Sequence, residues 1–293
     1  MENVYDIKAK ENLNFILPLN KRITNIEEIY RNNVAIVIHL YYLDTINYYF
    51  KYIENIPEDI IVFFTVSNYR IKKMLEKKEI VKKRNWKIIE KQNRGRDISA
   101  FLVACRKELL KYEYICFLHD KKEKNAILKE DTRQWIACLW ENMIGSSIYI
   151  DNVLSLFNEN KRLGVLVPPF PMGTHQRTSY VNIWYDNFPL TLGLTERMSL
   201  RCDLNLEKPP ITIGTVFWAR VSALKKLFEI EWKYDDFDEE PLKNDGTLSH
   251  AIERVFAYVA QDAGYQTGWV MADSYAGNRF EYMQEIFRST FYR

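Results

Sequence analysis

A histidine, an aspartate and two lysines follow an apolar run near the middle of the chain. The run covers residues 115–118, and His119, Asp120, Lys121 and Lys122 come next, with no turn residue between them. Carboxylate and imidazole groups can bind cations or accept protons, and ammonium groups can neutralise phosphate oxygens. A buried strand that ends directly in such groups predicts a binding site at the end of that strand.

Polar groups also follow three earlier apolar runs. In chain order they are His39, Asp44, Ser67, Asn68, Arg94, Gly95, Arg96 and Asp97. In an open parallel sheet, ligands bind outside the carboxyl ends of the strands. Two guanidinium groups at the start of a helix favour a phosphate or pyrophosphate. The four strand ends therefore predict a nucleotide site along one edge of a sheet.

Each of these groups also has a structural interpretation, which the sequence leaves open. Asp97 is equally suited to cap the helix that we expect from residue 98, with Gly95 supplying the turn. Lys121 and Lys122, taken alone, are typical of a solvated turn.

The elements that must position these groups alternate along the chain. Apolar runs over residues 34–42, 59–68, 86–92 and 114–118 alternate with helical patterns over 45–55, 71–84 and 98–112. This alternation predicts an α/β fold, a single domain with a mostly parallel nucleotide-binding sheet flanked by helices. Further on we expect a long irregular segment over 168–195, a strand over 211–220 and a helix over 246–261.

Composition limits the kinds of partner. The chain has 293 residues with 47% hydrophobic and 27% charged content, which is typical of a globular protein with a real core. Its 41 basic and 39 acidic residues leave a net charge of +2, so we expect no nucleic-acid partner.

The expected location is the cytoplasm. The four cysteines form no CxxC pair, which favours free thiols in a reducing compartment. The N-terminal stretch is acidic and lacks an apolar region, and no window approaches the roughly 18 apolar residues of a membrane span. We therefore expect membrane contact to be peripheral, at the inner face of the membrane.

Five stretches of the sequence resemble one family, the rhamnan synthesis protein F family of bacterial cell-surface polysaccharide glycosyltransferases. They are HLYYLD (39–44), NRGRDISAFL (93–102), YICFLHDKK (114–122), GTVFWARVSAL (214–224) and NDGTLSHAIERVF (244–256). The resemblance implies a GT-A-like nucleotide-sugar fold, dTDP-L-rhamnose as donor and a lipid-linked glycan as acceptor. Members are often longer chains with further modules, so a single module could serve another sugar or acceptor. Tyr42 lies in the first stretch and joins the expected donor site.

The resemblance also implies a division of the chain. We expect an N-terminal extension over 1–33, a glycosyltransferase domain over 34–275 and a C-terminal tail over 276–293. Within the domain, residues 34–160 would bind the nucleotide-sugar, and residues 161–275 would hold the acceptor and the catalytic groups.

Metal dependence is left open by the same resemblance. GT-A enzymes end this strand in an Asp-x-Asp motif that holds Mg²⁺ or Mn²⁺ against the pyrophosphate, whereas this chain has His119, Asp120, Lys121 and Lys122 there. Either His119 and Asp120 recruit the ion with help from elsewhere, or the two lysines neutralise the leaving diphosphate themselves. Residues 269–279 contain no histidine ligand. We expect weak or absent metal dependence, with Asp120 as the candidate ligand.

Transfer with inversion also requires a base near the acceptor hydroxyl. In the helix expected over 246–261, His250, Glu253 and Arg254 lie opposite the apolar stripe, a face that is solvated in most helices. Glu253 stands eleven residues before the Gly264–Tyr265 pair, where inverting GT-A enzymes carry their catalytic acid, and is the first candidate. The other catalytic candidates are Asp245, Glu240 and His250. Trp218 could contact the sugar, although an aromatic residue in a strand more often belongs to the core.

Two other classes of function remain as alternatives. A non-catalytic glycan-binding or scaffolding module of a polysaccharide assembly complex would keep the fold without turning over a nucleotide-sugar. A glycoside hydrolase would need paired acids such as Glu239 and Glu240, but the side chains of adjacent residues usually point apart.

Overall fold

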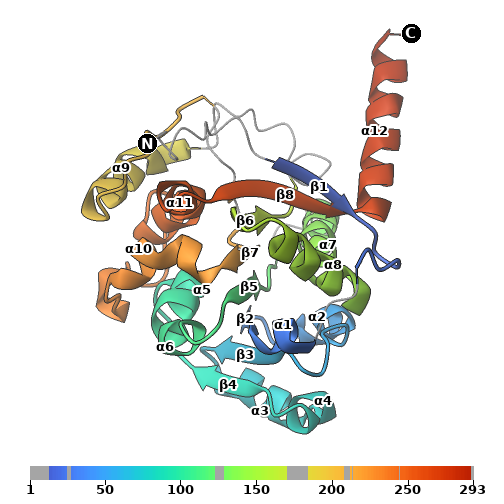
Figure 1. Ribbon diagram of the computed structural model, residues 1–293. Helices are drawn as coiled ribbons and strands as arrows, with labels where there is room; N and C mark the ends of the chain where they lie inside the picture. Colours follow the sequence, from blue (N-terminus) through green and yellow to red (C-terminus); the bar gives the residue numbers. More distant parts are fainter. Residues whose placement is uncertain are drawn as a thin grey trace.

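The chain folds around one eight-stranded sheet in a computed structural model that describes residues 13–24, 28–122, 129–169, 184–207, 212, 214–243 and 245–291. Across the sheet the strands follow the order β1 (Leu13–Leu17), β8 (Gln266–Ala272), β6 (Leu163–Val167), β7 (Phe217–Arg220), β5 (Tyr114–His119), β2 (Val34–Leu40), β3 (Ile61–Val66) and β4 (Lys87–Glu90). Helices cover both faces (Figure 1). The predicted α/β fold with a mostly parallel sheet is confirmed.

The four strands that end in polar residues are neighbours and run parallel. β5 pairs with β2, β2 with β3, and β3 with β4. β2 and β5 are buried at every position, which explains their nearly continuous apolar sequences. The register places His39 opposite His119, so the carboxyl ends of these two strands lie at the same level.

Two features of the sheet lie outside the sequence prediction. β7 runs antiparallel to both β5 and β6, and it is shorter than the strand expected over 211–220. β1 pairs in parallel with β8 and forms one edge of the sheet, although it lies within the expected N-terminal extension.

Helices on one face of the sheet include α2 (Ile46–Ile53), α3 (Tyr69–Lys77), α4 (Glu79–Lys83), α7 (Lys129–Ile144) and α8 (Ser147–Glu159). On the other face lie α5 (Arg96–Ser99), the π-helical turn Ala100–Ala104, α6 (Arg106–Leu109), α9 (Phe188–Arg197), α10 (Lys225–Glu229) and α11 (Leu248–Asp262). The short helix α1 (Glu28–Asn32) precedes β2, and α12 (Asp273–Phe291) projects from the body after β8 (Figure 1). Within the described ranges, no helix has the length and apolarity needed to span a membrane.

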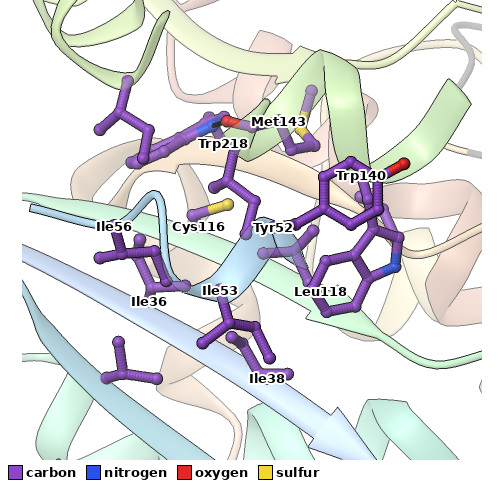
Figure 2. Packing of buried hydrophobic residues seen from close by; sticks show 14 of the residues in the cluster. Ile36, Ile38, Tyr52, Ile53, Ile56, Cys116, Leu118, Trp140, Met143 and Trp218 are labelled. Carbon is purple, nitrogen blue, oxygen red and sulfur yellow. Dashed lines mark hydrogen bonds between the residues drawn. The ribbon is translucent and has the colours of Figure 1, made fainter. Parts of the chain in front are cut away.

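Each face of the sheet has its own apolar core, because successive strand side chains point to opposite sides. In the first core, Ile36 and Ile38 of β2 pack with Cys116 and Leu118 of β5, and α7 contributes Trp140 (Figure 2). Burying an aliphatic side chain of this size fully stabilises the fold by about 1.5–3 kcal/mol. These contacts hold the strand ends at fixed positions.

The segment expected to be irregular over 168–195 is helical in its last part. Residues 170–183 lie outside the described residues, but α9 begins at Phe188, so the prediction is wrong there. Proline is tolerated in a first helical turn, and Thr191 and Leu194 are buried where α9 packs on α11. Tertiary packing outweighs the weak helix propensity of the Thr- and Gly-containing sequence.

Candidate functional site

A cavity of about 1190 Å³ opens at the carboxyl ends of β2 and β5. Small-molecule pockets usually measure about 300–1,000 Å³, so this cavity is at the large end of that range or beyond it. The predicted site residues that line it are His39, Tyr42, Arg96, Asp97, His119, Asp120, Lys121, Lys122, Glu240, Asp245, His250 and Glu253. Those outside the lining are Asp44, Ser67, Asn68, Arg94, Gly95 and Trp218, and Asn68 instead caps α3.

Two neutral histidines form part of the strand-end wall. His39 Nδ1 lies 3.0 Å from Thr65 Oγ1, and burial lowers the pKa of this imidazole to about 3. His119 Nδ1 lies 2.9 Å from the Asp120 carbonyl oxygen, and its Nε2 lies 2.7 Å from the Gly214 carbonyl oxygen. Burial also lowers the pKa of His119. Burial therefore favours the uncharged form of both rings, and a neutral His119 ring can donate to only one of its two carbonyl partners.

Asp120 holds the loop after β2 against the end of β5. Its carboxylate accepts hydrogen bonds from the backbone N–H of Tyr41 at 2.9 and 3.0 Å and of Tyr42 at 2.8 Å. Burial raises the pKa of Asp120 to about 7, although these N–H groups favour its ionised form. In the part of the chain that the structure describes, no three His, Cys, Asp or Glu side chains gather as metal ligands. The described residues thus form no preformed metal cage, whereas Mg²⁺ is usually held by one or two carboxylates together with substrate phosphates, and Asp120 is the carboxylate that could serve here.

The two lysines after Asp120 differ in their surroundings. Lys121 Nζ lies 4.4 Å from the centre of the Trp135 ring, and burial lowers the pKa of its ammonium group. Lys122 Nζ binds the Asp44 carboxylate, and 40% of its side chain is exposed. Lys121 is therefore the inner cation, whereas Lys122 lies at the rim with its charge already paired.

The turn between β4 and α5 presents one carboxylate to the pocket. Gly95 has φ +71°, and a Cβ there would lie 2.6 Å from the Phe237 ring, so the turn requires glycine. Gly95 itself is the N-cap residue, so Asp97 lies inside α5 and does not cap it. Asp97 Oδ2 lies 3.9 Å from His119 Nε2. Burial would raise the pKa of Asp97, but His119, Lys121 and His39 together hold it below its ordinary value.

Only one of the two predicted phosphate-binding arginines faces the pocket. Arg94 donates from Nε to the Phe237 carbonyl at 2.7 Å and from Nη1 to Asp235 at 2.9 Å, so it fastens the turn to residues 235–237. Arg96 lines the pocket with 44% of its side chain exposed, and its Nε lies 3.6 Å from Glu240 Oε1.

Trp218 cannot contact a sugar in this pocket, so that prediction is wrong. Its side chain is fully buried, and its Nε1 donates to the Met143 carbonyl at 2.9 Å (Figure 2). β7 is an inner strand that is covered on both faces, and Trp218 belongs to the core beside Cys116. Ser67, at the end of β3, has a buried hydroxyl for which the described residues supply no hydrogen-bond partner.

The face of α11 that lies opposite its apolar stripe is part of the site. Glu253 accepts a hydrogen bond at Oε1 from the backbone N–H of Gly214, and His250 Nδ1 lies 2.8 Å from Thr247 Oγ1. Burial lowers the pKa of His250. Arg254 is also a lining residue and donates to the His250 carbonyl at 2.9 Å. This helix face lines the pocket, so the interpretation as a solvated face is wrong.

The two reserve carboxylates are more firmly engaged. Asp245 accepts from the Asp186 backbone N–H at 2.8 Å and from the Asn187 side-chain amide. Burial would raise the pKa of Asp245, but these hydrogen bonds hold it below its ordinary value. Glu240 Oε2 accepts from the Leu242 backbone N–H at 3.0 Å. A carboxylate with a depressed pKa is a poor proton acceptor, so Asp245 is a weaker candidate base.

Several groups around the site carry no strand-end pattern in the sequence. Lys91, just after β4, is buried, and its pKa is lowered by burial to about 8. Tyr185 and Trp135 line the pocket from segments that no strand-end pattern marks. The only signal for Lys91 was its place beside the NRGRD stretch, where a lysine is ordinarily solvated.

Comparisons with known proteins point to one family. The family model of rhamnan synthesis protein F matches residues 1–265. The uncharacterized protein WxcX of Xanthomonas campestris pv. campestris strain B100 is 25% identical over 245 residues, which covers 82% of this chain and 33% of WxcX. WxcX of a second strain of that pathovar gives the same values. The chain thus spans about a third of the length of these relatives.

Proposed function

This chain belongs to the rhamnan synthesis protein F family, and we propose that it acts in polysaccharide synthesis as a GT-A-like inverting glycosyltransferase. The proposed donor is a nucleotide-sugar, dTDP-L-rhamnose, and the proposed acceptor is a lipid-linked cell-surface polysaccharide precursor. The proposed site of action is the cytoplasm, at the inner face of the membrane.

One observation carries this proposal. A single cavity at the carboxyl ends of parallel strands joins a cationic wall, with Lys121 and Arg96, to a wall on α11 that carries Glu253. A sugar transfer from a nucleotide donor needs both, because negative charge develops on the leaving diphosphate while the acceptor hydroxyl loses a proton.

On the donor side, Lys121 and Arg96 would stabilise the diphosphate. Lys121 is already desolvated, so its charge acts in a medium of low dielectric constant. At about 4 Å and an effective dielectric constant of about 20, one such charge pair is worth roughly 4 kcal/mol. Lys122 and the neutral histidines would shape the rim and the floor.

On the acceptor side, Glu253 would accept the proton of the attacking hydroxyl. The hydroxyl oxygen forms the new bond to the anomeric carbon, and the bond between that carbon and the diphosphate oxygen breaks. The diphosphate leaves with the electron pair, and the proton moves to the Glu253 carboxylate. The Gly214 N–H that donates to Oε1 fixes the orientation of this carboxylate.

A thermal-shift panel tests the donor half of the proposal. Nucleoside diphosphates and nucleotide-sugars are each added at millimolar concentration, with and without Mn²⁺, to the wild type and to Arg96→Met. Ligands that bind the folded state raise the melting temperature, and we expect the largest rise with dTDP and dTDP-rhamnose. A chain that responds to none of them, while glycans do bind, is instead a non-catalytic glycan-binding module.

A further inference from the structure

Tyr185 combines an unfavourable backbone with an exposed ring. It begins the 3-10 turn Tyr185–Asn187, and its φ of +45° lies in the left-handed region that bulky residues rarely adopt. Its side chain is 58% exposed and lines the cavity. Residues are held in such conformations mainly where the surroundings fix them, often at ligand-binding sites.

A set of hydrogen bonds fixes this conformation. Asp245 accepts from the backbone N–H of Asp186 at 2.8 Å, and it also accepts from the side-chain amide of Asn187. The side-chain oxygen of Asn187, Oδ1, accepts in turn from the Gly246 backbone N–H at 3.0 Å. Asn187 is fully buried, and Gly246 adopts φ +70°. The two residues after Tyr185 are therefore fixed by these hydrogen bonds, and they restrict the Tyr185 backbone from its C-terminal side.

The ring lies on the side of the cavity that carries the proposed base. Asp245, which anchors the turn, lies 3.9 Å from Arg254, and Arg254 donates to the His250 carbonyl one helical turn away. Glu253 lies between these two residues on the same helix and lines the same cavity. An acceptor hydroxyl must reach Glu253, so a ring at this end is placed for the acceptor and not for the nucleotide.

We propose that Tyr185 is the platform of an acceptor subsite, on which a pyranose ring of the acceptor glycan stacks. An aromatic face offers a large rigid contact at low entropic cost, and the exposed ring borders a cavity larger than one donor requires. Asp245 is then the residue that positions this platform, which accounts for its engaged carboxylate better than a role as base does. The choice of glycan rests on the proposed function.

The test uses glycan binding, which does not depend on turnover. A rhamnose trisaccharide is titrated into the intact wild-type chain, Tyr185→Gly, Tyr185→Phe and Phe280→Ala, with binding followed by ligand-observed NMR. Glycine adopts positive φ without steric strain, so Tyr185→Gly removes the ring while favouring the native turn. Phe280 on α12 is 60% exposed and is not among the cavity residues, so its removal is the matched control.

The expected result is binding to the wild type that weakens about 3- to 10-fold in Tyr185→Gly and stays within about twofold in Tyr185→Phe and Phe280→Ala. Absence of trisaccharide binding to the wild type, or equal binding by Tyr185→Gly, overturns the proposal. A parallel titration with dTDP separates the two claims. If dTDP does not bind but the glycan does so through Tyr185, the donor proposal fails and the subsite stands.

Discussion

Replacing Glu253 by glutamine tests the proposed base with little disturbance of the fold. The amide has the shape of the carboxylate, and its oxygen can still accept the hydrogen bond from the Gly214 N–H that Oε1 accepts in the wild type. We therefore expect stability to change by less than about 0.5 kcal/mol. Glu253→Ala, by contrast, leaves that N–H unpaired in a partly buried place and should cost about 1–3 kcal/mol.

The expected loss of rate is much larger than the loss of stability. A missing general base typically lowers the rate about 10²- to 10⁴-fold, which raises the barrier by about 3–5 kcal/mol. Donor affinity should survive, because the residues proposed to bind the diphosphate, Lys121 and Arg96, are unchanged in this variant. The assays are urea unfolding, calorimetric titration with dTDP and acceptor-dependent release of dTDP.

Glu240→Gln and Asp245→Asn are the comparison variants, since both carboxylates line the same cavity. If one of them abolishes transfer while Glu253→Gln retains most of its activity, the assignment of the base is wrong. The result would also show that the Glu253–Gly214 hydrogen bond serves the fold alone.

Charge and pH give the remaining predictions. Lys121→Met should lower the transfer rate about 10²- to 10³-fold. Lys122→Met should lower it less, because the Lys122 ammonium is paired with Asp44. EDTA should have little effect on the wild type, and activity abolished by EDTA would contradict this view. Burial lowers the pKa of His39 from 6.5 to about 3. As the pH falls, His39 therefore binds a proton in the unfolded chain at a higher pH than in the folded chain. The stability that neutral His39 contributes is thus present above pH 6.5 and is lost towards pH 3, by about 1.4 kcal/mol per pH unit. In urea unfolding at pH 7, 6 and 5, the stability gap between wild type and His39→Gln should shrink accordingly, and a constant gap would show that His39 does not titrate this way.

The strand-end groups were predictable because the sequence pattern of apolar and polar residues shows where each buried strand ends. β2 and β5 are apolar along their whole length since both faces are covered, and the first polar residues mark where each strand leaves the core. The carboxyl ends of parallel neighbours lie at one edge, so the gathering of His39, Asp97 and His119 followed from the sequence alone.

The remaining features depend on long-range contacts that local sequence does not encode. Trp218 is apolar and aromatic, which fits a core and a sugar platform equally, and only the place of β7 inside the sheet decides between them. The role of Arg94 depends on the Phe237 carbonyl and the Asp235 carboxylate, about 140 residues away along the chain. The positive φ of Tyr185 precedes a turn whose Asp186 N–H and Asn187 amide donate to Asp245, about 60 residues further along the chain, and no pattern around Tyr185 reveals these bonds.

The most direct test of the central claim is transfer itself. Purified wild-type chain is incubated with dTDP-L-rhamnose and a membrane extract that contains lipid-linked glycan, and the glycan is analysed by mass spectrometry and NMR. We expect acceptor-dependent release of dTDP, addition of one deoxyhexose with inverted anomeric configuration, and collapse of both signals in Glu253→Gln. A chain that binds glycan yet releases no nucleoside diphosphate from dTDP-rhamnose or from any other nucleotide-sugar would contradict this claim.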